Sequence, residues 1–363
     1  MSSITRARRR ALALIAGTLL VAFGAAPALA CGGLIGPNGA VNLLRTTTFA
    51  GYHDGEEHYV TAFEFAGGGG AFGSLTPLPG VPSSVEKGGD WTLQRLRLET
   101  DPVLETAVFA AGAEDAAARG SAEVLMEVTI DALDITVLRG GAAEVGTWAT
   151  DHGFRLPPDA PEVLEFYAER SPIFMAVRYD GARAADQGLA AGDGTPVHVV
   201  IPTTNPWVPL RILGLGAPAE APVEADVYLL TDGEPATLPV AIGPDEAEAL
   251  GEEVRPGLVL ERSEPASATL LADLRSDKGM RWLPEDDVWL TYLRVDSRAG
   301  DLTYDLAIDA SGAGQPAPVA AGLDPVATEA NGLGPGLWVA LSLIAAFVVV
   351  GELERRRSGR PAF

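Results

Sequence analysis

The chain has 363 residues, with 49 acidic and 26 basic side chains and a formal net charge of −23. A surface this acidic repels the phosphates of nucleic acids and anionic lipids, so we predict no nucleic-acid partner. Two interpretations stay open: the acidity weakly attracts a basic or cationic envelope partner, or it simply keeps a secreted domain soluble. Cys31 is the only cysteine, which excludes an intramolecular disulfide and leaves stability to a buried core, as the 47% hydrophobic content allows.

Residues 1–30 have the layout of a secretory signal peptide. A basic segment at 6–10 precedes an apolar segment at 11–26, and Ala28-Leu29-Ala30 is a small-x-small cleavage signal. We therefore predict that the mature chain begins at Cys31. Two alternatives stay open, namely an uncleaved membrane helix and a lipidated Cys31, although lipoprotein signals usually carry Leu where this chain has Ala28.

Residues 31–310 are predicted to form an extracytoplasmic β-rich domain, either as one unit or as two subdomains divided near 235–245. A hairpin signal at Asp54-Gly55 separates two strand patterns, and residues 142–170 read as a helix–helix insertion. Strands are predicted at 41–49, 57–65, 124–138 (a pair), 173–179, 197–201, 208–213 and 223–230, and a hairpin at 288–295 with 301–308. A loop is expected at 181–195.

The order of these elements indicates the fold class. Strands come first, helices follow and strands return, without the alternation of strand and helix that a parallel sheet requires. We therefore predict an α+β, β-rich fold with a mostly antiparallel sheet, joined to one C-terminal transmembrane helix.

The C-terminal part indicates where the protein works. Residues 311–333 are rich in Gly, Ala and Pro and are predicted to be a stalk. The apolar residues 334–351 suit a transmembrane helix, since about 20 such residues span a bilayer. Arginines in the tail at 352–363 are typical of the cytoplasmic side. We therefore predict a single-pass protein of the cell membrane whose bulk is extracytoplasmic.

Four stretches together resemble a known family. They are Cys31-Gly32-Gly33, the proline-punctuated residues 75–82, residues 148–179 with Trp148 and His152-Gly153-Phe154, and residues 196–213. Over about 31–235 the chain resembles the bacterial exported proteins grouped as domain of unknown function 2330, and it departs from them at the glycine run in 64–73. The resemblance implies an exported protein of the same fold. Because the family has no established activity, the resemblance implies no catalytic residue.

The clearest candidate site is the set His53, Glu56 and His58. In a hairpin that turns at Asp54-Gly55, all three side chains lie on one face, and two imidazoles with a carboxylate suit zinc or another divalent metal. The alternative is an ordinary solvated hairpin tip.

The remaining patterns in the sequence give weaker evidence for a functional site. The glycines at 68, 70 and 73 match a dinucleotide fingerprint, but no helix follows them, so we predict no bound cofactor. His152 and His198 stand alone in the sequence. Trp207, Trp282 and Trp289 would either pack in the core or form a surface for a ligand.

From these features we predict a membrane-tethered binding or scaffolding module of the bacterial cell envelope, held at the membrane by its C-terminal helix. No catalytic signature is present, which favours a protein that is not an enzyme. The alternatives are an envelope hydrolase or metal-dependent enzyme with a carboxylate or histidine site, and a purely structural envelope component.

Overall fold

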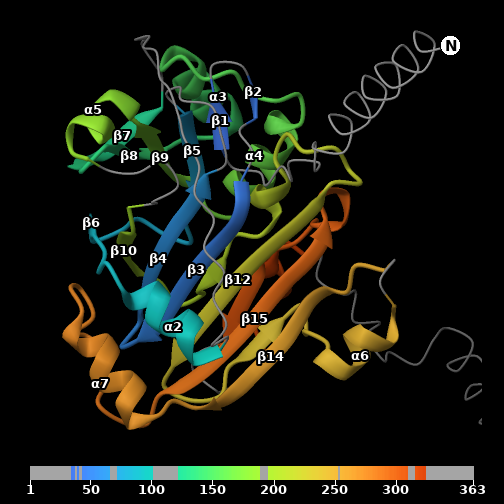
Figure 1. Cartoon of the computed structure of the whole chain (residues 1–363). Coiled ribbons are helices and arrows are strands. Elements are labelled where there is room, and N and C mark those ends of the chain that lie inside the picture. Colours follow the sequence, from blue (N-terminus) through green and yellow to red (C-terminus); the bar gives the residue numbers. More distant parts are fainter. Residues whose placement is uncertain are drawn as a thin grey trace, which may run out of the picture. The chain divides into compact units, whose positions relative to one another are not determined.

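The computed structural model describes residues 34–36, 39–40, 43–65, 72–100, 122–188, 195–251, 254–309 and 315–323 (Figure 1). The predicted signal peptide, Cys31, the predicted transmembrane helix at 334–351 and the tail at 352–363 lie outside them. Among the residues that are described, no helix is long and apolar enough to cross a membrane.

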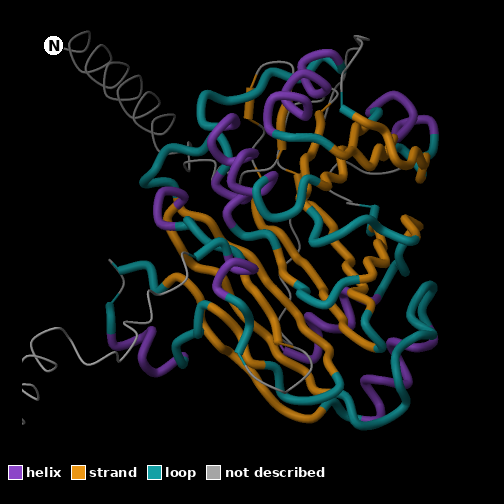
Figure 2. The backbone as a smooth tube through the Cα atoms, turned by 180° about the vertical axis from the view of Figure 1, so that it is seen from behind, coloured by secondary structure: helices purple, strands orange, loops and turns teal. Residues whose placement is uncertain are grey.

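The largest sheet has seven strands in the order β14-β15-β12-β3-β4-β10-β6. Their bounds are β3 (Leu43–His53), β4 (Glu56–Phe65), β6 (Ser84–Lys87), β10 (Val197–Pro202), β12 (Pro222–Thr231), β14 (Gly257–Pro265) and β15 (Trp289–Arg298). Every neighbouring pair is antiparallel except β12 and β3, which run parallel. Figure 2 shows the long strands of this sheet side by side from behind.

The other strands of the described residues form two smaller sheets. The order in the six-stranded sheet is β2-β1-β5-β9-β8-β7, and in the three-stranded sheet it is β11-β16-β13. Their bounds are β1 (Leu34–Gly36), β2 (Gly39–Ala40), β5 (Phe72–Pro77), β7 (Glu123–Ile130), β8 (Leu133–Arg139), β9 (Ile173–Tyr179), β11 (Trp207–Val208), β13 (Ala236–Leu238) and β16 (Leu306–Asp309). The pairs between these strands are antiparallel.

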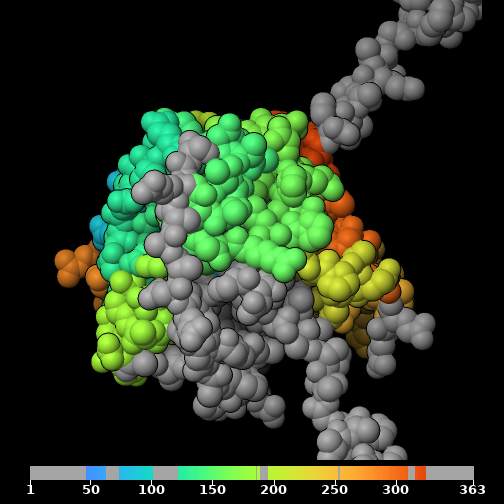
Figure 3. Space-filling model, turned by 90° about the horizontal axis from the view of Figure 1, so that it is seen from above, coloured from blue at the N-terminus to red at the C-terminus, as the bar shows by residue number. Residues whose placement is uncertain are grey.

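Short helices connect the strands. They are α2 (Thr92–Thr100), α3 (Ala142–Asp151), α4 (Ala160–Ala168), α5 (Gly181–Asp186), α6 (Pro244–Ala249) and α7 (Ala268–Ser276), with the 3-10 turns η1 (Arg211–Gly214), η2 (Ala299–Asp301) and η3 (Pro318–Ala321). Gly153 follows α3 with φ of 83°, a conformation that glycine adopts at low cost after a helix. Seen from above, the α3–α4 region contributes the green surface of Figure 3.

The seven-stranded sheet is buried on both faces. On one face, Phe49 and Tyr228 belong to a core that includes leucines of α2 and α7. On the other face, Tyr59 and Val227 belong to a larger core that includes residues of the six-stranded sheet, of α3 and of α4. Because successive side chains of a strand point to opposite faces, each central strand supplies both cores.

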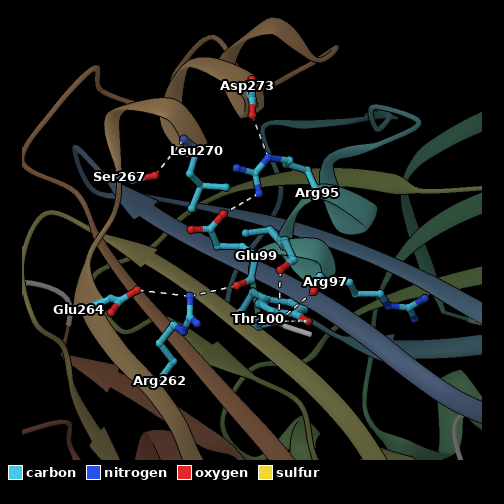
Figure 4. Close-up of polar contacts among 11 residues, drawn as sticks. Arg95, Arg97, Glu99, Thr100, Arg262, Glu264, Ser267, Leu270 and Asp273 are labelled. Atoms are coloured by element: carbon cyan, nitrogen blue, oxygen red, sulfur yellow. Dashed lines mark hydrogen bonds and ion pairs between the residues drawn. The ribbon is translucent and has the colours of Figure 1, made fainter. Parts of the chain in front are cut away.

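An ion pair joins α2 to α7, and a second one within α2 orients the same arginine (Figure 4). Arg95 of α2 donates from Nε to Asp273 of α7 at 2.8 Å and from Nη1 to Glu99 at 2.7 Å. At the start of α7, the Ser267 hydroxyl accepts from the backbone N–H of Leu270 at 3.1 Å, a normal N-terminal cap. The two helices therefore fix the position of the loop that follows α7, which contributes to the site described below.

The predicted fold class is confirmed at the level of an α+β, β-rich fold with mostly antiparallel sheets and several helices. The turn at Asp54-Gly55, with φ of 51° and 84°, and the helix–helix insertion are also observed. The predicted loop at 181–195 instead begins with α5. β12 and β15, which flank the possible division at 235–245, are neighbours in one sheet.

Two strand predictions are wrong for the same physical reason. Residues 208–213 form only the end of β11 before η1, and β16 pairs with β11 and β13 rather than with β15. The buried carboxylate of Asp305 accepts from the backbone N–H groups of Leu210 at 2.7 Å and Arg211 at 3.0 Å. These bonds replace strand pairing after β11 and draw β16 away from β15.

Part of the predicted stalk belongs to the folded domain. Ala321 in η3 is fully buried, and its carbonyl accepts from the backbone N–H of Asp305 at 2.9 Å. Arg170 donates to the carbonyl of Ala320 at 2.8 Å. Small side chains allow this close packing, so the composition that suggested a stalk also suits a buried turn.

Candidate functional site

The strongest candidate site is a buried pair of histidines on the seven-stranded sheet. His58 of β4 lies opposite Val200 of β10, and His198 lies opposite Val60, so both histidines lie on the same face as diagonal neighbours. His58 Nδ1 is 3.1 Å from His198 Nε2, and both residues are buried. One ring donates its N–H and the other accepts, so each ring fixes the tautomer of the other.

Trp282 covers His58. The two rings are stacked with their centroids 3.7 Å apart and their planes at 6°. Gly51, directly opposite His58 on β3, makes this possible, since a Cβ at Gly51 would overlap the Trp282 ring. The indole Nε1 is buried and has no hydrogen-bond partner among the described residues. The sheet therefore needs glycine at this position for the tryptophan to lie flat.

The loop after α7 is bonded to the start of α2 through Asp277 and lies close to His198 at Gly279. Asp277 Oδ2 accepts from the Thr92 backbone N–H at 2.8 Å and from its hydroxyl at 2.6 Å, which caps the start of α2. Gly279 has φ of 82°, and a Cβ there would lie 2.9 Å from His198 Nδ1. The loop can approach the imidazole closely only with glycine at this position.

An open cavity of about 550 Å³ lies in front of the pair. We call it the histidine pocket, and its lining residues are His58, Ser84, Glu86, His198, Val200, Ser276, Asp277, Lys278, Gly279, Arg281 and Trp282. The charged side chains Glu86, Lys278 and Arg281 are exposed at its rim. Most of the lining side chains are polar or charged, and Trp282 supplies an aromatic wall, so the pocket offers many groups that could orient a ligand.

Burial keeps both imidazoles uncharged. Together with the neighbouring His198 and His53, which contribute less, burial lowers the pKa of His58 to about 3. Burial also lowers the pKa of His198, although the carboxylate of Glu86 opposes this. At neutral pH the pair offers nitrogen lone pairs and N–H groups to a ligand, but no positive charge.

The predicted set His53, Glu56 and His58 does lie on one face, since His53 is opposite Glu56 and His58 is opposite Gly51. However, His53 Nδ1 is 2.7 Å from Asp232 Oδ1, while His58 pairs with His198. Among the described residues, no group of three or more His, Cys, Asp or Glu side chains is arranged to hold a metal ion. A metal at these three residues stays a prediction.

The other candidates have ordinary surroundings. His152 Nδ1 donates to the carbonyl of Trp148 at 2.7 Å. Trp207 is buried in the larger core and stacks on Tyr167, and Trp289 Nε1 donates to Ser263 Oγ at 2.8 Å. Of the glycines at 68, 70 and 73, the first two lie outside the described residues.

The sequence did not predict the pairing of His198 with His58, the role of Asp277 or the stack of Trp282 on His58. One signal was available, because His198 interrupts the apolar residues Val197 and Val199 and must point to the opposite face. The pairing of β10 with β4 was not visible, since His58 and His198 are 140 residues apart in the chain.

Glu57 is a second unusual group, but it lies on the opposite face of β4 from the pocket. Its side chain is fully buried, and neither carboxylate oxygen has a hydrogen-bond partner at bonding distance and angle in the described part of the chain. Burial raises its pKa to about 8, and the nearby backbone N–H of Trp207 opposes this only in part. Glu57 is therefore protonated in the folded protein at neutral pH.

A second hollow, of about 620 Å³, lies along α3 and α4. Its lining is mostly small or apolar, including Ala142, Gly146, Leu156 and Leu164, and it contains no histidine. It offers fewer groups for specific recognition than the histidine pocket does.

Comparisons with known proteins identify the family. None of the curated proteins matches. Baculovirus P35 is 11% identical with a TM-score of 0.33, over 52% of this chain and 64% of that one. A mutated baculovirus P35 after caspase cleavage is 10% identical with a TM-score of 0.36, over 74% and 98%. Likenesses this distant carry no argument about function. The model of DUF2330, described as an uncharacterized protein conserved in bacteria, matches residues 25–239, and the chain therefore belongs to that family.

Proposed function

We propose that this protein is a ligand-binding module of the bacterial cell envelope, with the histidine pocket as its binding site. The observation that carries the proposal is the buried, uncharged pair of His58 and His198 beside an open cavity of about 550 Å³. Burying polar rings costs free energy, which an apolar pair of the same size would avoid. Binding sites often retain such groups because they supply specificity.

The pocket favours binding over catalysis. A general acid or base works best with a pKa near the working pH, whereas the pKa of His58 is lowered to about 3. The hydroxyl of Ser276 donates to the carbonyl of Asp273 at 2.8 Å rather than to an imidazole. An envelope hydrolase or metal-dependent enzyme is therefore the second candidate, favoured only by the presence of the histidines.

The proposal places the domain outside the cytoplasm, tethered by the apolar residues 334–351. The signal-like residues 1–30 and the arginines after the apolar run support this orientation. Treating intact cells with an impermeant protease should cut the acidic domain. If the domain were cut only after the cells were opened, the orientation would be the reverse.

Native mass spectrometry of the full chain, extracted from membranes of expressing bacteria, tests the binding site. We expect a small-molecule adduct on the wild type that Ser84→Trp, which fills the pocket, removes. Ser83→Trp is the matched control, because Ser83 is exposed and does not line the pocket. An adduct that survives Ser84→Trp, or a wild type without any adduct, would contradict the proposal.

A further inference from the structure

Three neighbouring strands place three metal-binding side chains on one face of the sheet. His58 is on β4, His198 is on β10, and Glu86 of β6 lies directly opposite His198. Side chains directly opposite in an antiparallel pair have their Cβ atoms about 5 Å apart. All three residues line the histidine pocket, and Glu86 is exposed.

We infer that His58 and His198 bind one divalent transition-metal ion of the zinc or copper class, with Glu86 as the third ligand. The inference rests on the proposed function, because it names the ligand class of the same pocket. Two imidazoles and one carboxylate are a common ligand set for such ions, and they leave one position open. That open position faces a cavity large enough for a further ligand.

The spacing of the two rings fits this role. Zn–N bonds of about 2.0–2.1 Å that meet at a tetrahedral angle separate their nitrogens by about 3.3 Å. His58 Nδ1 and His198 Nε2 are 3.1 Å apart. An ion can therefore take the place of the shared proton, which moves to the other nitrogen of the ring that donated it, once both rings turn to point their lone pairs at the ion.

Glu86 must rotate toward the pair to complete the set, because no three such side chains are clustered in the described residues as they stand. Its exposure leaves it free to do so. Besides the histidines, the pocket has two acidic residues, Glu86 and Asp277, and two basic residues, Lys278 and Arg281. Their charges balance, so the pocket does not repel a cation.

The surroundings limit how far the rings move. Trp282 is stacked on His58, and the loop at Gly279 lies close to His198. Because the ligands stand on paired strands, the backbone needs little reorganisation and only the side chains turn to bind an ion. His53, by contrast, lies at the hairpin end with Asp232.

Calorimetric titration of the metal-free full chain with Zn²⁺, Cu²⁺ and Mg²⁺ tests the inference. We expect one Zn²⁺ or Cu²⁺ per chain and no Mg²⁺, which prefers oxygen ligands. His58→Gln and His198→Gln should each weaken binding at least tenfold, and Glu86→Gln should weaken it by less. His152→Gln and His53→Gln are matched controls that should bind as the wild type does.

Co²⁺ absorption gives a second measurement that does not depend on the buried variants folding. A bound Co²⁺ should show visible bands that the exposed Glu86→Gln variant shifts. No Zn²⁺ or Cu²⁺ binding, or binding lost in His53→Gln but kept in His198→Gln, would overturn the inference. If metal binding failed while Ser84→Trp still removed a small-molecule adduct, the proposed function would stand without this ligand class.

Discussion

At the scale of single residues, Glu57 and His58 are neighbours in β4 with opposite surroundings. The carboxyl of Glu57 points into the larger core without a hydrogen-bond partner at bonding distance and angle, and burial raises its pKa to about 8. His58 points to the other face, where it contacts His198 and Trp282. One strand thus buries a carboxyl on one face and an imidazole on the other, each in its uncharged form.

Glu57 should make the metal-free protein less stable as pH rises. The folded state keeps the Glu57 proton up to a pKa of about 8, whereas the unfolded chain releases it near the ordinary glutamate pKa of 4.5. Stability is therefore lost between these two pH values, by on the order of 4 kcal/mol at pH 8. Glu57→Gln should remove this loss in urea unfolding at pH 6.5 and 8 with a chelator present. Glu56→Gln is the control, and an unchanged slope in Glu57→Gln would contradict the assignment.

Gly51 should be required for the stack of Trp282 on His58. Gly51→Ala places a methyl group where the indole lies, so we expect a loss of about 1–3 kcal/mol and a shifted tryptophan emission. Gly233→Ala is the matched control, since a Cβ there meets no atom within 4 Å. Equal unfolding free energies for the two variants would mean that the indole does not pack on Gly51.

At the scale of elements, Asp305 joins four segments of the chain. Its carboxylate accepts from the Tyr167 hydroxyl of α4 at 2.8 Å and from two backbone N–H groups at η1. It also pairs with Arg170, whose guanidinium lies 4.2 Å from the ring centroid of Phe166 and 4.9 Å from that of Trp207. The contacts of Arg170 and Asp305 with η3 bring that turn into the same cluster.

Asp305→Asn should be strongly destabilising, by about 3–5 kcal/mol, because it leaves the buried Arg170 without its counter-charge. The measurement is denaturant unfolding at neutral pH. Asp301→Asn serves as the control, because Asp301 is exposed. Near-equal stability of the two variants would show that the Asp305 network contributes little.

At the scale of the whole molecule, the folded domain extends further along the chain than its composition indicates. Residues 315–323 are described together with the rest of the domain, and Ala321 has no exposed surface. The segment covers the Asp305 cluster and is part of the larger core.

Ala321→Glu in the full chain distinguishes a packed turn from a stalk. A carboxylate at this buried position should cost about 3 kcal/mol and lower the melting temperature by several degrees. Val319→Glu should have little effect, since Val319 is 60% exposed. If the two variants had the same melting temperature, residues 315–323 would be a solvated stalk.

Local patterns predicted the elements better than their partners. The turn at Asp54-Gly55, the helix–helix insertion at 142–170 and the strand at 173–179 follow from nearest-neighbour chemistry, and the structure has all three. The position of β16 depended on the hydrogen bonds of Asp305, which no window of sequence contains. The candidate site shows the same limit of local sequence. His58 was identified from the hairpin, whereas its partner His198 comes from a distant strand.

The parallel pair of β3 and β12 has a consequence for how this protein is made. Asp232, just after β12, contacts His53 at the end of β3 from 179 residues away. Until β12 has left the ribosome, the hairpin of β3 and β4 presents an unpaired backbone edge, which favours aggregation. Contacts this far apart in sequence also slow folding. Biogenesis should therefore depend on chaperones that shield the early hairpin until the second half of the chain arrives.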